Sequence, residues 1–133
     1  MVYNEKERGE QTVEQPLAIE RKPFKNGLVL KLTGDVTKAA ESELLAGFEG
    51  GDGFGEGVRF LALDLSRVPY INSGGMAVLI RLARGGKKAG LHTFAWGVTP
   101  HYEKLFRMVG LTEFVMLYPD EFAVFQRIES LEI

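Results

Sequence analysis

The chain has 133 residues, of which 45% are hydrophobic and 26% are charged, and its formal net charge is −2. This length and balance fit one globular domain with its own core, and they exclude a fibrous or wholly disordered chain. The near-neutral charge provides no global field for binding nucleic acid or anionic lipid. The lack of cysteine excludes disulfides, thiolate catalysis and cysteine-ligated zinc.

Residues 1–15 are polar and mixed in charge, so we expect a flexible N-terminal tail before a domain at residues 16–133. This segment lacks the apolar core of a secretory signal. No apolar run approaches the roughly 20 residues of a membrane-spanning helix. We therefore expect a cytoplasmic protein with no membrane insertion.

Residues 17–21 and 28–32 predict two strands. Between them lies Asn26-Gly27, a dipeptide that favours a tight hairpin turn because both residues tolerate positive φ. Thr37 then predicts the start of a helix. The apolar side chains on one face of this helix are Ala40, Leu44, Leu45 and Phe48.

The glycine-rich stretch 50–57 predicts a flexible loop rather than a phosphate-binding loop, because it lacks the Gly-Lys-Ser/Thr ending and leads from a helix into a strand. The apolar run 60–63 is typical of a buried parallel strand. After Ser73, apolar residues recur at helical spacing until Gly90. Residues 91–96 predict the next strand.

Thr99-Pro100 predicts a helix start, an N-cap hydroxyl followed by proline at the first helical position, and Gly110 predicts the end of that helix. Residues 114–118 predict a last strand before a C-terminal helix. The predicted fold class is therefore α/β: a single domain with a mainly parallel sheet of about four to five strands, an N-terminal hairpin and about four covering helices.

The carboxyl ends of the predicted strands meet at one edge of such a sheet, where α/β proteins place their functional groups. We expect an exposed interaction surface here, with little catalytic equipment. Its candidate residues are Gly34, Asp35, Ile71, Asn72, Ser73, Gly74, Gly75, Met76, Gly97, Val98 and Thr99.

Ser73 opens the predicted central helix, and two roles are open to it. Its hydroxyl can cap the helix by accepting from a backbone N–H two or three residues on. Alternatively, it can carry a phosphoryl group, because the free N–H groups and dipole of a helix N-terminus favour an anion. Gly74 and Gly75 leave the hydroxyl uncovered for a kinase.

Other chemistries are less well supported. Ser73 lacks the Gly-x-Ser-x-Gly pattern of a hydrolase nucleophile, because position 71 is Ile. His92 and His101 have no partners that indicate a metal site. The cations of the central helix predict a solvated face, because no aromatic residues alternate with them. We expect no enzyme, metal or cofactor.

The segments 63–75, 97–100 and 105–111 together resemble the signature of STAS domains, the family of bacterial anti-sigma factor antagonists. The resemblance spans roughly residues 17–131. It implies a sheet with interspersed helices and transcription regulation by partner switching. This chain departs from the family pattern at two positions. Asn72 stands where Asp is common in the family, and Gly74 stands where Ser, Thr or Ala is common.

The resemblance implies that the unphosphorylated chain binds an anti-sigma factor, a serine kinase of the GHKL type. The kinase phosphorylates the serine at the start of the second helix, which by its position is Ser73. This modification releases the chain from the kinase, and a serine phosphatase restores binding. The alternative is a STAS scaffold or sensor without phosphorylation, which binds a nucleotide or a transporter or signalling partner. We expect no nucleic acid partner, and a monomer or a weak homodimer.

Overall fold

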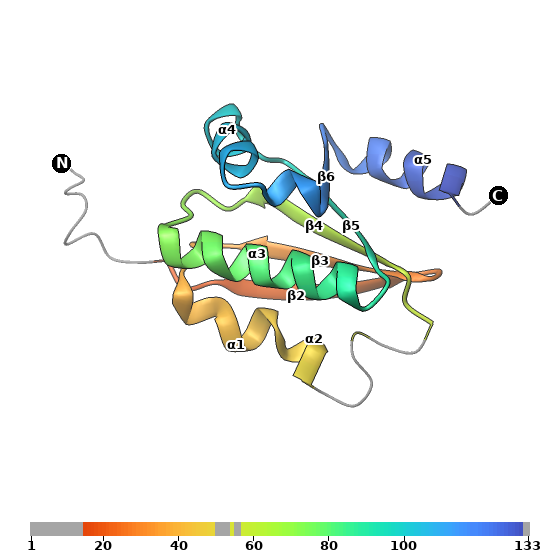
Figure 1. Cartoon of the computed structure of the whole chain (residues 1–133), viewed down its shortest axis with the longest axis horizontal. Helices are drawn as coiled ribbons and strands as arrows, with labels where there is room; N and C mark the ends of the chain where they lie inside the picture. The colour runs from red at the N-terminus through yellow and green to blue at the C-terminus, as the bar shows by residue number, and fades with distance from the viewer. Residues whose placement is uncertain (1–14, 50–53, 55–56, 132–133) are drawn as a thin grey trace.

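The computed structural model describes residues 15–49, 54 and 57–131, and it shows an α/β arrangement in the predicted order (Figure 1). The strands are β2 (Ala18–Phe24), β3 (Gly27–Thr33), β4 (Phe60–Arg67), β5 (His92–Trp96) and β6 (Val115–Tyr118). The helices are α1 (Glu41–Leu44), α2 (Ala46–Glu49), α3 (Ser73–Lys88), α4 (Pro100–Met108) and α5 (Glu121–Leu131), with short 3₁₀ turns η1 (Lys38–Ala40) and η2 (Leu111–Glu113).

The strands form one sheet in the order β2-β3-β4-β5-β6, in which only the first pair is antiparallel. Each later strand follows a helical crossover, as parallel pairing requires. The predicted fold class, a mainly parallel sheet with an N-terminal hairpin, is therefore confirmed.

The hairpin turn lies one residue earlier than predicted. Phe24 pairs with Gly27, so that Lys25 and Asn26 make the turn, and Lys25 takes the positive φ of 33°. A side chain at Gly27 would overlap the ring of Phe24. Gly27 is therefore a strand residue covered by the ring of Phe24, and it does not itself form the turn.

The two faces of the sheet carry two separate apolar cores. The larger core packs beneath α3, with contributions from Leu44 of α1 and Phe106 of α4. The smaller core gathers Phe60, Phe94 and the α5 residue Val124 on the other face. Figure 1 shows α3 lying across one face of the sheet. The two long helices α3 and α5 therefore cover opposite faces.

The prediction of one continuous helix after Thr37 is wrong, because the structure has η1, α1 and α2 there. Thr37 caps η1 by accepting from the Ala39 amide at 3.2 Å, and the chain then leaves helical geometry at Leu45 before α2 begins. The break is at Leu45, and the α2 that follows has only four residues, one of them Gly47, a poor helix former. The expected face is present in Ala40 and Leu44, both buried, while the side chain of Phe48 lies outside the described part of the chain.

The later helix boundaries agree with the prediction. Thr99 caps α4 with Pro100 at its first position, and Gly90 and Gly110 follow α3 and α4 with φ of 85° and 81°. Trp96 is buried, with 5% of its surface exposed.

Most of the predicted glycine-rich loop, residues 50–53 and 55–56, and residues 1–14 of the predicted tail lie outside the described residues. Among the described residues, no helix has the length and apolar character needed to cross a membrane.

Candidate functional site

Hydrogen bonds join the loop after β3 to the loop after β4. The Gly34 amide donates to the Arg67 carbonyl at 3.1 Å, and the Val36 amide donates to the Tyr70 carbonyl at 2.9 Å. The Asn72 amide returns a bond to the Val36 carbonyl at 3.3 Å, which completes an isolated parallel bridge between residues 36 and 71. The segment 67–72, which leads into Ser73, is therefore held by hydrogen bonds to the loop after β3.

The loop after β5 is connected to the same edge through α4. Thr99 caps α4 by accepting from the Tyr102 amide at 3.3 Å. The Tyr102 hydroxyl in turn accepts from the Ile71 amide at 3.0 Å. Gly97, with φ of 81°, passes so close to the Ser66 backbone that a Cβ would lie 2.6 Å from its Cα. The structure thus brings together all three predicted strand-end loops.

Gln15 is attached to this edge as well. Its amide donates to the Asp35 carboxylate at 3.0 Å, and its carbonyl accepts from the Asp35 amide at 3.0 Å. Gln15 is the last residue of the predicted N-terminal tail, and these two hydrogen bonds place it beside the predicted interaction surface.

Asn72, and not Ser73, is the N-cap of α3. The Asn72 side-chain oxygen accepts from the Gly75 amide at 2.8 Å, while Ser73 is already the first helical residue. The capping role considered for Ser73 is therefore wrong. Within the described residues, no hydrogen bond engages the Ser73 hydroxyl, and the residue is exposed. Its hydroxyl is free for chemistry or for contact with a partner.

Gly75 has a packing role that differs from the one expected. A Cβ at this position would overlap the Val36 carbonyl, so only glycine lets α3 approach the loop after β3 this closely. Gly74 is less restricted, because a Cβ there would lie 3.2 Å from the Cβ of Lys38. Gly75 thus positions the helix start, while Gly74 lies beside Ser73 at its surface.

The predicted site residues divide by exposure. Gly34, Ile71, Gly75 and Met76 are buried and support the edge from within. The residues that reach solvent are Asp35, Asn72, Ser73, Gly74, Gly97, Val98 and Thr99. We call this second set the Ser73 surface.

Three residues at this edge are not among the predicted site residues. Tyr70 is 48% exposed and directly precedes Ile71, which forms the bridge with Val36. Lys38 packs against Gly74 at the start of α3. Tyr102 supports the loop from a helix 31 residues away along the chain. Tyr70 follows Pro69 in a predicted loop, where an exposed aromatic residue is a usable signal, but no local signal indicates the contacts of Lys38 or Tyr102.

The arrangement does not resemble a hydrolytic centre. The His92 ring stacks on Phe60 with centroids 5.7 Å apart, and the His101 ring packs against its neighbour Tyr102. Neither imidazole is hydrogen-bonded to Ser73 in the part of the chain that the structure describes. No group of three or more His, Asp or Glu side chains among those residues is placed to hold a metal ion.

The cations of α3 are partly used within the molecule. Arg81 forms an ion pair with Glu41 at 2.7 Å, and the Lys87 ammonium lies 5.3 Å from the centroid of the Phe114 ring. Both contacts join α3 to its neighbours. The other two cations of the predicted face, Arg84 and Lys88, are exposed.

A protein-family model described as "Mlab, STAS domain" matches residues 24–118. Among curated proteins, no sequence matches the chain. The solved structures that it resembles include the phosphorylated form of SpoIIAA, a Bacillus cell fate determinant, at 19% identity, with 82% of this chain and 98% of that chain covered and a TM-score of 0.62. An anti-sigma factor antagonist from Mycobacterium paratuberculosis aligns at 18% identity over 86% of this chain and 95% of its own, with a TM-score of 0.66.

A third similar structure is the murine anion transporter Slc26a9. Its identity is 15% and its TM-score is 0.66, and the match covers 82% of this chain but 18% of the transporter. At these identities the structural likeness establishes a shared fold. That fold occurs both in small antagonists and within a much longer transporter chain.

Proposed function

This chain belongs to the STAS domain family, and from that premise we propose that it is an anti-sigma factor antagonist that acts by partner switching. In its unphosphorylated form it binds an anti-sigma factor kinase of the GHKL type and so frees a sigma factor. Phosphorylation of Ser73 releases the kinase, and a serine phosphatase reverses the modification. The chain then regulates transcription through binding rather than through catalysis of its own.

The observation that carries this proposal is the uncommitted, exposed Ser73 hydroxyl at the first position of α3. Because Asn72 already caps the helix, modification of Ser73 removes no hydrogen bond that α3 needs. A phosphoryl group adds about −1.5 to −2 charges at pH 7. The N-terminal dipole of α3 favours that charge, so that phosphorylation changes the surface and leaves the fold intact.

The Ser73 surface has the composition of a docking site for a protein. It combines small residues that allow close approach with the polar side chains of Asp35, Asn72 and Thr99. The exposed ring of Tyr70 lies in the loop that leads into it, and aromatic side chains are enriched where protein interfaces bind tightly. New charge at the centre of such an interface weakens binding through repulsion and desolvation.

The test is phosphorylation of the purified chain by its cognate kinase with ATP, followed by intact mass. We expect an increase of about 80 Da, one phosphoryl group, which Ser73→Ala abolishes and Ser42→Ala preserves. Ser42 is a suitable control because it is another exposed helical serine. Calorimetric titration should then show weaker kinase binding by the phosphorylated chain. No mass change, or one that survives Ser73→Ala, would refute the switch.

A second function is a STAS scaffold that holds a transporter or signalling partner without phosphorylation. The family description "Mlab, STAS domain" and the likeness to part of an anion transporter favour it. Under this function Ser73→Ala leaves partner binding unchanged, and no kinase modifies the chain. A nucleotide sensor of the same fold would instead show a higher melting temperature when nucleotide is added.

A further inference from the structure

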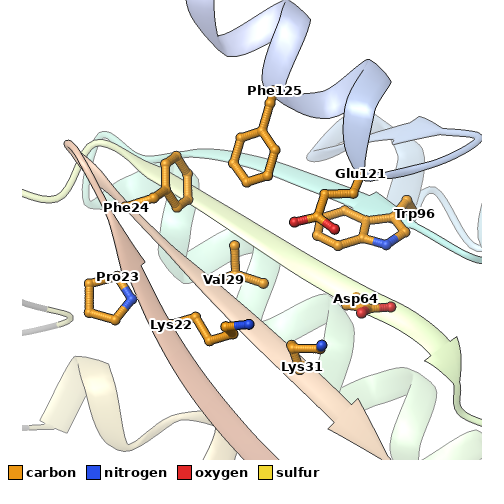
Figure 2. Close-up of a pocket in the computed structure, with 9 residues that line it drawn as sticks. All are labelled: Lys22, Pro23, Phe24, Val29, Lys31, Asp64, Trp96, Glu121 and Phe125. Atoms are coloured by element: carbon orange, nitrogen blue, oxygen red, sulfur yellow. The ribbon is translucent and has the colours of Figure 1, made fainter.

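A hollow of about 210 Å³ lies on the face of the sheet opposite α3. It is bounded by the β2–β3 hairpin, by β4 and β5, and by the start of α5 (Figure 2). Its volume equals that of about seven waters at roughly 30 Å³ each. A small molecule fits it, and a drug-sized ligand needs more space.

The register of the sheet explains why the hollow is polar at one end. Lys31, Asp64 and Trp96 are direct neighbours across β3, β4 and β5, so their side chains share one face. The apolar row before them, with Val29 and Phe94, is the part that α5 covers. The hollow therefore lies where the cover by α5 ends.

Aromatic rings form the apolar wall. Phe24 and Phe125 meet edge to face with their centroids 4.9 Å apart, and Trp96 lies at the other side, as Figure 2 shows. Val29 lies between these rings at the base. An aromatic ring of a ligand finds its preferred stacking and edge partners at such a wall.

Four charged side chains complete the lining, and they comprise equal numbers of cations and anions. Lys22 and Lys31 extend from the hairpin, Asp64 comes from β4, and Glu121 reaches over the sheet from α5 (Figure 2). Among the described residues, no ion pair within 4.0 Å joins any two of them. Asp64 Oδ1 accepts hydrogen bonds from the amide of Ser66 at 3.0 Å and from its hydroxyl at 2.6 Å, so Asp64 has its second carboxylate oxygen left for a ligand.

We propose that this hollow binds a free aromatic α-amino acid. The ligand carboxylate pairs with the two lysines, its ammonium group with Asp64 and Glu121, and its ring with Phe24, Phe125 and Trp96. A polyanion such as a nucleotide is disfavoured, because the two carboxylates repel phosphate groups. The site lies on the opposite face of the sheet from α3, and the inference does not depend on the partner-switching proposal.

Trp96 is the single tryptophan of the chain, so its fluorescence reports on this site directly. We expect titration of the full chain with L-phenylalanine, which is far less fluorescent than tryptophan, to change the Trp96 emission in a saturable way. Phenylacetate lacks the ammonium group and phenethylamine lacks the carboxylate. Each should bind at least about tenfold more weakly, a loss of about 1.4 kcal/mol.

Lys22→Gln and Glu121→Gln should each weaken L-phenylalanine binding about fivefold or more, while Lys104→Gln on α4 should leave it unchanged. All three positions are exposed, so the variants are expected to fold, and melting curves without ligand check this. L-phenylalanine should also raise the melting temperature of the unsubstituted chain. The proposal is overturned by a lack of saturable change at millimolar L-phenylalanine, by an analogue that binds as tightly as L-phenylalanine, or by Lys22→Gln and Glu121→Gln variants that bind L-phenylalanine as tightly as Lys104→Gln does.

Discussion

The hydroxyl oxygen of Tyr102 accepts a hydrogen bond from the backbone amide of Ile71 at 3.0 Å. This contact joins α4 to the loop that ends one residue before the N-cap of α3. It thus couples the position of α4 to the start of α3, the preceding crossover helix, at the carboxyl edge of the sheet. The hydrogen bond fixes the backbone at Ile71, directly before Asn72 and Ser73 of the Ser73 surface.

Tyr102→Phe should leave the part-buried Ile71 amide unpaired and lower the free energy of unfolding by about 1–2 kcal/mol. Urea unfolding measures this loss, and amide exchange at Ile71 should become faster. Tyr118→Phe is the matched control, because no described residue is hydrogen-bonded to that hydroxyl, and it should cost less than about 0.5 kcal/mol. Equal costs for both variants would contradict the role assigned to Tyr102.

Asn72→Ala should destabilise the domain by about 1 kcal/mol, because the cap on the Gly75 amide is lost. Asn72→Asp should stay within a few tenths of a kcal/mol of the parent, since both side chains cap well. Chemical denaturation of the two variants in parallel provides the comparison. If Asn72→Ala were neutral, Ser73 would be able to take over as the cap, and its hydroxyl would not be independent of the helix.

Gly75→Ala should be far more damaging than Gly74→Ala. A Cβ at position 75 overlaps the Val36 carbonyl, which forces the helix away from the loop at a cost of about 2–3 kcal/mol. At position 74 the Cβ meets the Cβ of Lys38 at 3.2 Å, and a gain in helix propensity of up to about 1 kcal/mol offsets that contact. Melting temperatures of the two variants test the difference, and a reversed order would show that α3 is not held against Val36.

Ser73→Asp should unfold at the same temperature as the parent or slightly higher, because a negative charge in the first turn of a helix contributes about 0.3–1 kcal/mol. The same variant should bind the anti-sigma partner less well. Thermal unfolding by circular dichroism and a binding titration separate the two effects. A loss of more than about 1 kcal/mol of stability would mean that Ser73 supports the fold and is unsuited to a switch.

Thr93→Val should stabilise the protein. Thr93 is 2% exposed, and its hydroxyl has no hydrogen-bond partner among the described residues. Removal of this buried polar group should add about 1 kcal/mol, or roughly 2–5 °C in melting temperature. Thr99→Val, the same change where the hydroxyl caps α4, should cost about 1 kcal/mol instead. A lower melting temperature for Thr93→Val would indicate an unseen partner for the hydroxyl.

The order of the elements, the mainly parallel sheet and the edge that carries Ser73 were predictable from the sequence. These features depend on local signals: apolar spacing, the Thr99-Pro100 helix start, and glycines such as Gly110 that end helices. The hairpin was predicted too, but its turn was misplaced by one residue, because Phe24 pairs with Gly27 and leaves Lys25 and Asn26 to form the turn. Local signals specify an element well and its boundary less well.

Only the tertiary structure decided how the edge is built. Asn and Ser are nearly equal as caps, so the sequence alone could not choose between Asn72 and Ser73. In the structure the bridge between Val36 and Ile71 ends directly before Asn72, and the Asn72 side chain caps α3. The mixed-charge hollow likewise depends on the register of three strands and on where α5 stops covering them. Both features arise from contacts between residues distant in the chain, which leave no periodic trace in its sequence.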